Sequence, residues 1–368
     1  MGDLGADRCA VYAARQWLGG DRRACDLVEL ARHLVGIQSQ LRTTPALAAW
    51  ARCAHVGGND LRHELEESRR LVRTWTVRGT LHVVAAADLP LFWQALRPEW
   101  ETRWSLYLDR HVTRNQRAEA AGACLEILAQ GPATRSQLLT GVQQALNCRE
   151  DWVAYLFSSW GGVLKDLAYA GKVVYGPELD GEVRFVRAED WVTLPAADVE
   201  PDEALAVLLE RYLRAYSPAR LQDFVYWSGV TAARARAALA HLEGRVAVHE
   251  GWLVLEDAGD QAAAGAPSPA DVGGVRLLPK FDPFLLAHKE KFYLDEAYYK
   301  AVFRPAGDIA AVILKSGRVI GTWRVEGYRV VPDLFAPVDD QTAAELAGEV
   351  EALSTWLRQA KGQGSRAR

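Results

Sequence analysis

Two glutamines separated by a single residue are the side chains in this sequence that could take part in a reaction. Gln38 and Gln40 stand in the stretch Gly36-Ile37-Gln38-Ser39-Gln40, directly after an amphipathic segment. An amide has no pKa near neutral pH, so it cannot act as a general base. It does offer a carbonyl acceptor and two N–H donors, which are enough to orient a water molecule or to hold a sugar or a base. A purely structural alternative is that both side chains cap the turn before Pro45.

A second motif, Arg73-Thr74-Trp75-Thr76-Val77-Arg78-Gly79-Thr80-Leu81-His82, follows downstream. Arg73 and Arg78 flank a tryptophan at a predicted strand pair, where arginine can contact phosphate or enter the minor groove of DNA. A local ion pair is the alternative for Arg78. His82 either supports the site or is a core histidine with satisfied hydrogen bonds.

A third motif, Leu277-Leu278-Pro279-Lys280-Phe281-Asp282-Pro283-Phe284, adds a lysine and an aspartate. Asp282 is predicted chiefly to cap a turn, with support of the site as the alternative. Lys289 and Lys291 belong to a predicted exposed basic loop, and Arg304 stands in Val302-Phe303-Arg304-Pro305. Lys280, Lys289, Lys291 and Arg304 are candidate DNA contacts, although a run of charge is more often a solvated face.

The elements that must position these residues repeat three times as helices followed by two short strands. Gly and Pro mark the turns, and N-cap hydroxyls with a proline at the first helical position mark helix starts at Ser217-Pro218 and Thr231. Helices are predicted at 26–35, 45–54, 60–69, 115–130, 134–146, 151–170, 201–215, 218–227 and 231–242. The strand pairs are predicted at 71–77 with 80–84, 172–175 with 183–186, and 245–249 with 252–255.

Three helices closed by a two-stranded ribbon form the winged-helix pattern, a variant of helix-turn-helix. The predicted fold class is therefore α+β, with three tandem winged helices, a small C-terminal β element and a terminal helix. The C-terminal strands are predicted at 275–278, 309–314, 318–323 and 328–331, with a hairpin turn at Lys315-Ser316-Gly317. The last helix is predicted at 340–359, followed by a disordered tail at 361–368. The predicted units are 1–112, 113–200, 201–258, an Ala/Gly/Pro-rich linker at 259–274, and 275–368.

Composition bounds the function. The chain has 368 residues, 49% of them hydrophobic and 24% charged, which is typical of a globular protein. Its net charge of −4 argues against a surface coated in basic residues, but not against a local basic groove. The sequence contains neither an apolar run of transmembrane length nor a signal peptide, so a cytoplasmic location is predicted. Five widely spaced cysteines predict single buried thiols rather than a disulfide framework or a zinc site.

The sequence resembles the AlkZ-like winged-helix DNA glycosylases over most of the chain. The resemblance rests on the three motifs taken together and in this order, on Val302-Phe303-Arg304-Pro305, and on the stretch Gly317-Arg318-Val319-Ile320-Gly321-Thr322-Trp323-Arg324. The resemblance implies a concave DNA channel and removal of alkylated purines or bulky crosslinking adducts. It implies that Gln38 and Gln40 are the catalytic pair. A glutamine at the second position favours the branch linked to bulky genotoxin adducts. The family's middle position is often hydrophobic, whereas Ser39 stands here, a departure that bears on substrate choice.

On this resemblance we expect a monofunctional DNA glycosylase that acts on double-stranded DNA carrying alkylated guanines, as repair or as self-resistance to a DNA-alkylating natural product. We expect no cofactor and no metal, and a monomer. The alternative is a non-catalytic winged-helix protein that binds DNA or a drug, including a transcriptional regulator. A helicase- or nuclease-associated module is a weaker third reading, because the sequence contains neither a phosphate-binding Gly-x-x-x-x-Gly-Lys-Ser/Thr loop nor an acidic metal cluster.

Overall fold

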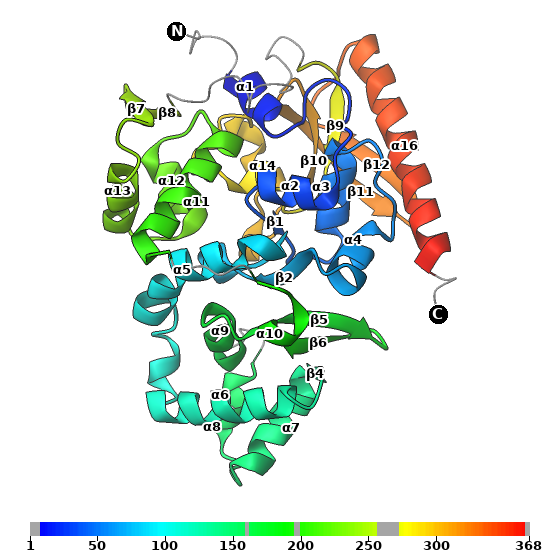
Figure 1. The fold of residues 1–368 in the computed structure, drawn as a ribbon. Coiled ribbons are helices and arrows are strands. Elements are labelled where there is room, and N and C mark those ends of the chain that lie inside the picture. Colours follow the sequence, from blue (N-terminus) through cyan, green and yellow to red (C-terminus); the bar gives the residue numbers. More distant parts are fainter. Residues whose placement is uncertain (1–7, 159–161, 195–198, 256–271, 365–368) are drawn as a thin grey trace.

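The structure is a computed structural model that describes residues 8–158, 162–194, 199–255 and 272–364. Its elements fall into four groups along the chain (Figure 1). The first group comprises α1 (Arg8–Arg15), α2 (Leu27–His33), β1 (Ile37–Gln38), α3 (Thr44–Arg52), α4 (Asp60–Arg62), β2 (Leu71–Trp75) and β3 (Leu81–Ala85). The second comprises α5 (Leu89–Glu99), α6 (Arg114–Leu128), β4 (Ala133–Thr134), α7 (Arg135–Ala145), α8 (Asp151–Leu156), α9 (Gly162–Tyr169), β5 (Val173–Leu179), β6 (Glu182–Arg187) and α10 (Ala188–Trp191).

The third and fourth groups complete the described chain. The third comprises α11 (Pro201–Tyr216), α12 (Leu221–Ser228), α13 (Ala232–Ala240), β7 (Val246–His249) and β8 (Trp252–Leu255). The fourth comprises β9 (Val275–Leu278), α14 (Pro283–Leu286), α15 (Tyr299–Val302), β10 (Ala311–Lys315), β11 (Arg318–Glu326), β12 (Arg329–Leu334) and α16 (Asp340–Gly364). The fold is thus mixed α and β, and each of the three predicted strand pairs is an antiparallel hairpin that follows helices.

The first two hairpins belong to one sheet. Six antiparallel strands lie in the order β1-β3-β2-β5-β6-β4, and the hairpins β2–β3 and β5–β6 meet at one paired position, Arg73 opposite Tyr175. The third hairpin, β7–β8, forms a sheet of its own. The first two groups are therefore coupled through the backbone, whereas the third joins them through side chains.

The fourth group is a sheet in the order β12-β11-β10-β9, covered along one side by α16 (Figure 1). The predicted turn between β10 and β11 is confirmed: Ser316 and Gly317 both have positive φ, which suits a two-residue hairpin turn. A Cβ at Gly317 would lie 2.2 Å from the carbonyl oxygen of Cys9. Only glycine therefore lets the backbone of α1 pack this closely against the turn.

One apolar core joins the four groups, because a single cluster of buried side chains runs from Cys9 in α1 to Leu353 in α16. A second, smaller cluster lies where α2, β1 and α3 meet, and it includes Leu30, Ile37 and Ala48. This second cluster fixes the helices on both sides of the Gln38-Ser39-Gln40 loop.

Two helix predictions were wrong in detail. The helix predicted at 151–170 is divided into α8 and α9, because the backbone leaves the helical conformation at Phe157, where φ is −100° and ψ is 14°. A Cβ at Gly162 would meet the carbonyl oxygen of Leu156 at 3.1 Å, so the two helices pack closely at this glycine. The helix predicted from Pro218 begins instead at Leu221. Ala219 pairs with Leu253 of β8, whose N–H donates to the Ala219 carbonyl at 2.9 Å, and the carboxylate of Asp223 accepts from the Arg220 N–H at 2.9 Å. The cap predicted at Thr231 is confirmed.

The two predicted irregular segments have different outcomes. The predicted linker falls mostly on residues 256–271, which lie outside the described residues, and Val272 beyond them is buried. The predicted disordered tail is wrong for residues 361–364, because α16 continues to Gly364, and 365–368 lie outside the described residues. No helix in the described ranges is long and apolar enough to cross a bilayer.

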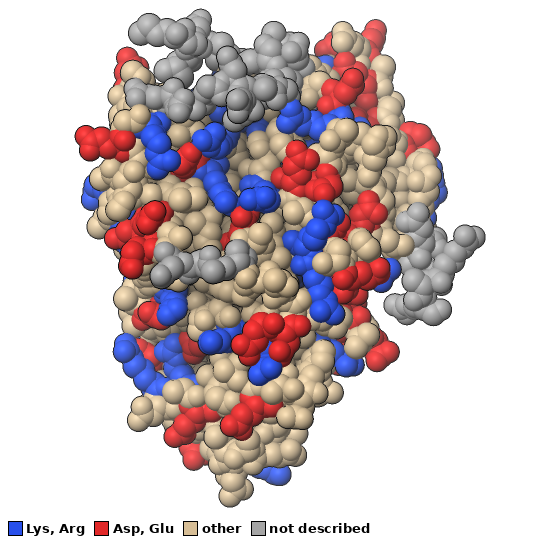
Figure 2. Space-filling model, in the orientation of Figure 1, with Lys and Arg blue, Asp and Glu red and all other residues tan. Residues whose placement is uncertain are grey.

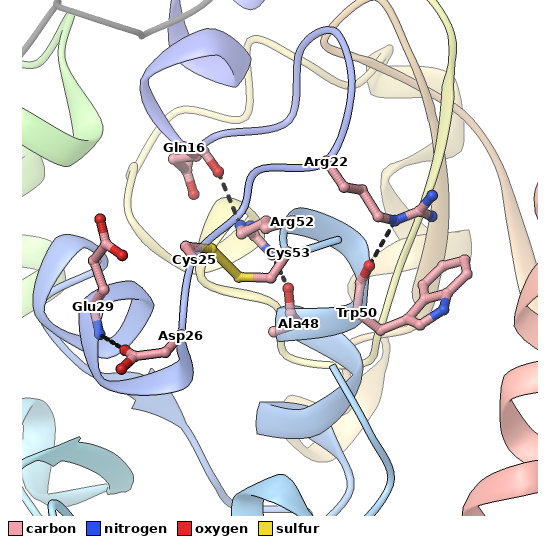
Figure 3. The surroundings of a disulfide bond; sticks show 9 residues. All are labelled: Gln16, Arg22, Cys25, Asp26, Glu29, Ala48, Trp50, Arg52 and Cys53. Carbon is pink, nitrogen blue, oxygen red and sulfur yellow. Dashed lines mark hydrogen bonds between the residues drawn. A yellow bond between two sulfur atoms is a disulfide. The ribbon is translucent and has the colours of Figure 1, made fainter. Parts of the chain in front are cut away.

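The cysteine prediction was wrong for one pair, because Cys25 and Cys53 form a disulfide (Figure 3). Their Cα atoms lie 5.5 Å apart, since the backbone around Arg23 pairs with the end of α3: the Arg23 N–H donates to the carbonyl of Arg52, and the Ala54 N–H donates to that of Arg23. Spacing in the sequence cannot show this return of the chain. Cys9 and Cys124 are buried thiols, as predicted, and Cys148 is half-buried.

Removing this disulfide is expected to destabilise the protein. The bond closes a loop of sequence separation 28, for which the chain-entropy relation gives about 3–4 kcal/mol of free energy of unfolding. Cys25→Ser should therefore lower the denaturation midpoint in urea, and a reducing agent should have the same effect on the wild type. Cys148→Ser is the matched control, because Cys148 forms no disulfide. Equal midpoints for wild type and Cys25→Ser under oxidising conditions would contradict the prediction.

Candidate active site

The Gln38-Ser39-Gln40 loop is held at the edge of the six-stranded sheet. Strand β1 pairs with β3, so Gln38 lies opposite His82, and the Ser39 N–H donates to the carbonyl of Leu81 at 2.7 Å. The guanidinium of Arg73 donates to the carbonyl of Ser39 at 2.9 Å. Gln38 and Ser39 are buried, whereas Gln40 is exposed at the start of the turn into α3. The loop thus has a fixed backbone, one buried amide and one exposed amide.

A row of polar side chains crosses the sheet at Gln38. Gln38 is opposite His82 in β3, and His82 is opposite Thr74 in β2. Directly opposed residues in antiparallel strands project to the same face, with Cβ atoms about 5 Å apart. Within the part of the chain that the structure describes, Oε1 of Gln38 and Oγ1 of Thr74 are buried and accept no hydrogen bond. A buried acceptor without a partner is costly, and a site for water or substrate accounts for such a group.

His82 is a neutral member of this row. Its Nδ1 lies 2.9 Å from Oγ1 of Thr76 and 3.1 Å from the carbonyl oxygen of Thr80. Burial, and secondarily the charge of Arg78, lowers the pKa of His82 to about 3. At neutral pH this imidazole therefore carries no charge and cannot serve as a proton donor in the manner of an imidazolium ion. It can still accept or donate hydrogen bonds within the row.

The structural alternative for the glutamines, a cap on α3, is not seen for Gln38. Thr43 stands at the N-cap of α3 and makes no side-chain cap, while Oε1 of Gln38 has no partner among the described residues. Thr44, which follows, instead donates its hydroxyl to the carbonyl of Lys280 at 2.8 Å. The helix after the glutamines is thereby tied to the third motif.

Asp282 has a structural place in this arrangement. Its carboxylate forms a bidentate ion pair with Arg52, at 2.7 and 2.9 Å, and both side chains are fully buried. One of its oxygens also accepts from the Phe284 N–H at 3.0 Å and caps α14. The predicted turn cap is therefore confirmed, and both oxygens are used within the protein. Sequence reasoning missed Arg52, because a basic residue at the end of a helix is normally exposed.

The six predicted DNA contacts differ in their surroundings. Three of them, Arg73, Arg78 and Lys291, donate to backbone carbonyls: Arg73 to Ser39, Arg78 to Trp227, and Lys291 to Leu285 and His288. Burial, and secondarily the charge of Arg78, lowers the pKa of Lys291 to about 7. Lys280 and Arg304 share the carboxylate of Asp308, and Lys289 is exposed.

The loop 288–291 is less exposed than predicted. His288 is buried and bonded to the carbonyl of Tyr216, and Lys291 is half-buried. The reason is that His288 packs edge-on against the rings of Tyr12 and Phe292 in the core. On the face drawn in Figure 2, basic side chains are interspersed with acidic ones. DNA contact by these six residues stays a prediction.

Comparisons with known proteins show the family to which the chain belongs. The model of a family described as DNA glycosylase AlkZ-like matches residues 31–356, which include every residue of the polar row. The chain belongs to this family. It is therefore a DNA glycosylase, and the non-catalytic alternative is set aside. A glycosylase of Streptomyces sahachiroi, described as an interstrand DNA cross-link repair enzyme, is 29% identical over 336 residues, covering 83% of this chain and 84% of that protein.

The fold has a solved counterpart. The structure of the Streptomyces sahachiroi DNA glycosylase AlkZ matches with a TM-score of 0.80 and 26% identity, over 98% of each chain. Within the described residues, no cluster of three or more His, Cys, Asp or Glu side chains has an arrangement that could hold a metal ion. The candidate site is thus built from amides, a neutral imidazole and hydroxyls.

Lowering the pH should reduce the free energy of unfolding, because His82 is held neutral in the folded state. The pKa of the imidazole is about 3 in the folded state, so between pH 6.5 and 3 the unfolded chain binds a proton that the folded chain does not. Stability therefore falls as the pH falls, by about 2 kcal/mol from this group between pH 7 and 5. His82→Gln should lose that part of the difference, measured by urea unfolding at both pH values. The exposed His249→Gln control should keep it, and an unchanged difference in His82→Gln would contradict the prediction.

Replacing one partner of the buried ion pair should lower the free energy of unfolding more than replacing both partners. Arg52→Met leaves the carboxylate of Asp282 buried without its partner, and we expect a loss of about 3–5 kcal/mol in the free energy of unfolding. The double variant Arg52→Met, Asp282→Leu should recover part of this loss, because no buried charge remains. Thermal and urea unfolding of the single and double variants measure the difference. A single variant as stable as the wild type would show that water compensates the charge.

Proposed function

We propose that this glycosylase hydrolyses the N-glycosidic bond of N7-alkylated guanines, including bulky or crosslinking genotoxin adducts, in double-stranded DNA. The observation that carries the proposal is the unpartnered, buried Oε1 of Gln38 in the row with His82 and Thr74. Such an acceptor can hold a water molecule through a hydrogen bond. The similarity to a cross-link repair glycosylase supports the class of adduct.

The chemistry follows from what the site lacks. Gln38 and Gln40 cannot take a proton from water, and His82 is neutral at pH 7 and is not an acid of useful strength. The departing base must therefore already be a good leaving group. An N7-alkylguanine carries a positive charge while attached to the sugar, so the C1′–N9 bond can break to give a neutral base and an oxocarbenium ion. Water adds to C1′, and its proton passes to solvent.

In this scheme the glutamines act by position and polarity. One amide carbonyl accepts a hydrogen bond from the attacking water and orients it toward C1′, and its partial negative charge favours the developing cation. Gln40 is exposed next to the buried Gln38 and Ser39, and it is placed to contact the sugar or the departing base. Arg73 supports both by holding the carbonyl of Ser39. A neutral base would leave only with an acid or base that this row does not contain.

The wider setting is part of the same proposal. The three groups of helices and hairpins act as tandem winged helices that form a concave DNA channel, with units at 1–112, 113–200, 201–258 and 275–368. Of the six predicted DNA contacts, the most accessible to phosphate are Lys280, Lys289 and Arg304, each of which is partly or fully exposed. The protein works as a cytoplasmic monomer without a metal or cofactor, in DNA repair or in self-resistance to an alkylating natural product.

Replacing either glutamine should remove catalysis while leaving the fold intact. Gln38→Ala and Gln40→Ala should each slow release of N7-methylguanine from methylated duplex DNA by about 10²-fold, the usual cost of losing one positioning group. Gln144→Ala, an exposed glutamine in α7, is the matched control and should release the base at the wild-type rate. Single-turnover release, followed by chromatography of the free base, measures all four proteins.

Two outcomes would contradict the proposal. If both glutamine variants kept the wild-type rate, the amides would not be the catalytic pair. If the wild type released neither N7-methylguanine nor a bulky N7-guanine adduct, the substrate class would be wrong. A duplex containing hypoxanthine, a neutral base, is the control substrate and should remain intact.

A further inference from the structure

A cavity opens directly beyond the Gln38-Ser39-Gln40 loop. It has a volume of about 400 Å³, and it begins at Leu41 and Thr43, the residues that lead from Gln40 into α3. Its opposite wall is the sheet of the fourth group, at the ends of β10 and β11. The apolar part of its lining is formed by Leu41, Leu47, Ala310, Ala311, Trp323 and Val325.

Hydrogen bonds fix the walls of this cavity. The hydroxyl of Thr44 donates to the carbonyl of Lys280, which ties α3 to the loop after β9. The indole N–H of Trp323 donates to the carbonyl of Leu278 at 2.8 Å, so its polar edge is turned into the protein and satisfied. Ala311 and Trp323 are paired positions of β10 and β11. The cavity is therefore preformed, and its volume falls in the range of small-molecule sites.

The mouth of the cavity leaves apolar surface in water. Leu41 is 39% exposed and Val325 is 44% exposed, one on each side. Three basic residues, Lys280, Arg304 and Arg324, also line the cavity, against one acidic residue, Asp333. All three basic side chains are more than a third exposed, although Asp308 pairs with the first two and Glu326 with the third. An apolar interior with a charged rim that carries exposed guanidinium and ammonium groups suits an apolar group that is attached to DNA.

We propose that this cavity holds the polycyclic aromatic body of an adduct while the guanine that carries it lies at Gln38 and Gln40. The inference rests on the proposed function, since it assigns a second part of the substrate to a second part of the same site. A flat ring system can pack against Trp323, between Leu47 on one side and Ala310 and Ala311 on the other. A methyl group is far too small to fill a cavity of about 400 Å³. The cavity therefore selects the adduct and leaves the hydrolytic step unchanged.

The test compares two duplexes that differ only in the adduct. One carries a single N7-methylguanine, and the other carries an N7-guanine adduct of a polycyclic aromatic epoxide. Leu47→Trp fills the cavity from a half-buried position. Leu139→Trp is the matched control, because Leu139 is also half-buried and lines a separate cavity of about 420 Å³ in the second group. Val325→Thr changes the mouth without disturbing the core, because Val325 is exposed.

We expect Leu47→Trp to lower kcat/KM for the aromatic adduct at least 10-fold and to leave methylguanine release within about 2-fold. Val325→Thr should lower kcat/KM for the aromatic adduct about 3-fold, and Leu139→Trp should change neither substrate. If a folded Leu47→Trp with wild-type Tm released both bases normally, or lost both equally, the assignment of the cavity would be overturned.

Binding separates this inference from the proposed function. A wild type that releases neither base would overturn the proposed chemistry, yet the cavity can still be tested by equilibrium binding of the same two duplexes. Leu47→Trp should then weaken binding of the aromatic duplex at least 10-fold and leave binding of the methylated duplex unchanged. Equal affinities of wild type and Leu47→Trp for the aromatic duplex would overturn the inference by itself.

Discussion

The buried ion pair between Arg52 and Asp282 is the contact on which the geometry of the site depends. Arg52 ends α3, the helix that follows the glutamines, and Asp282 caps α14 in the C-terminal group. The guanidinium also donates to the carbonyls of Gln16 and Ala48, so it joins three segments in the buried interior (Figure 3). Because both charges are fully buried, neither can be satisfied if α3 moves. The pair therefore holds α3 in one position relative to the C-terminal sheet.

The glutamine loop is consequently fixed from both ends. On the side before it, β1 pairs with β3, and on the side after it, α3 is held by the ion pair and by the disulfide at Cys53. A positioning mechanism needs this rigidity, because an amide contributes only through where it places water and dipoles. A flexible loop would lose most of that contribution. The buried ion pair thus gives the loop the rigidity that the proposed positioning mechanism requires.

The motif from Arg73 to His82 supports this loop. Arg73 holds the carbonyl of Ser39, His82 and Thr74 extend the polar row, and Arg78 donates to the carbonyl of Trp227 in α12. Arg78 thereby links the first hairpin to the third group of helices. These residues lie close together in the sequence because they belong to one hairpin. On one face of the hairpin Trp75 packs against Tyr175, and the other face carries the polar row with Thr74 and His82.

Local patterns in the sequence predicted the three hairpins, most helices and the Ser316-Gly317 turn, because each depends on neighbouring residues. Features that depend on distant residues were missed. Strand β1 has two residues and exists only because β3 lies beside it, and the disulfide forms only because α3 returns to Cys25. Helix α5 was not predicted, since Pro90 and Pro98 obscure its pattern. For the candidate site, the motifs predicted Gln38 and His82, which the structure places opposite each other. The burial of Arg52 could not be predicted from its place at a helix end.

Amide chemistry also constrains how such an enzyme can be selective. In the mechanism we propose, the row supplies no acid or base that titrates near neutral pH, so it would not activate an ordinary, neutral nucleobase in intact DNA. The positive charge of the lesion then supplies the discrimination between damaged and undamaged guanine. Discrimination among damaged guanines must come from elsewhere, since every N7-alkylguanine has the same leaving-group chemistry. Surfaces beyond Gln40, where the loop passes into α3 and faces the C-terminal sheet, are free to vary with the adduct while the polar row stays the same.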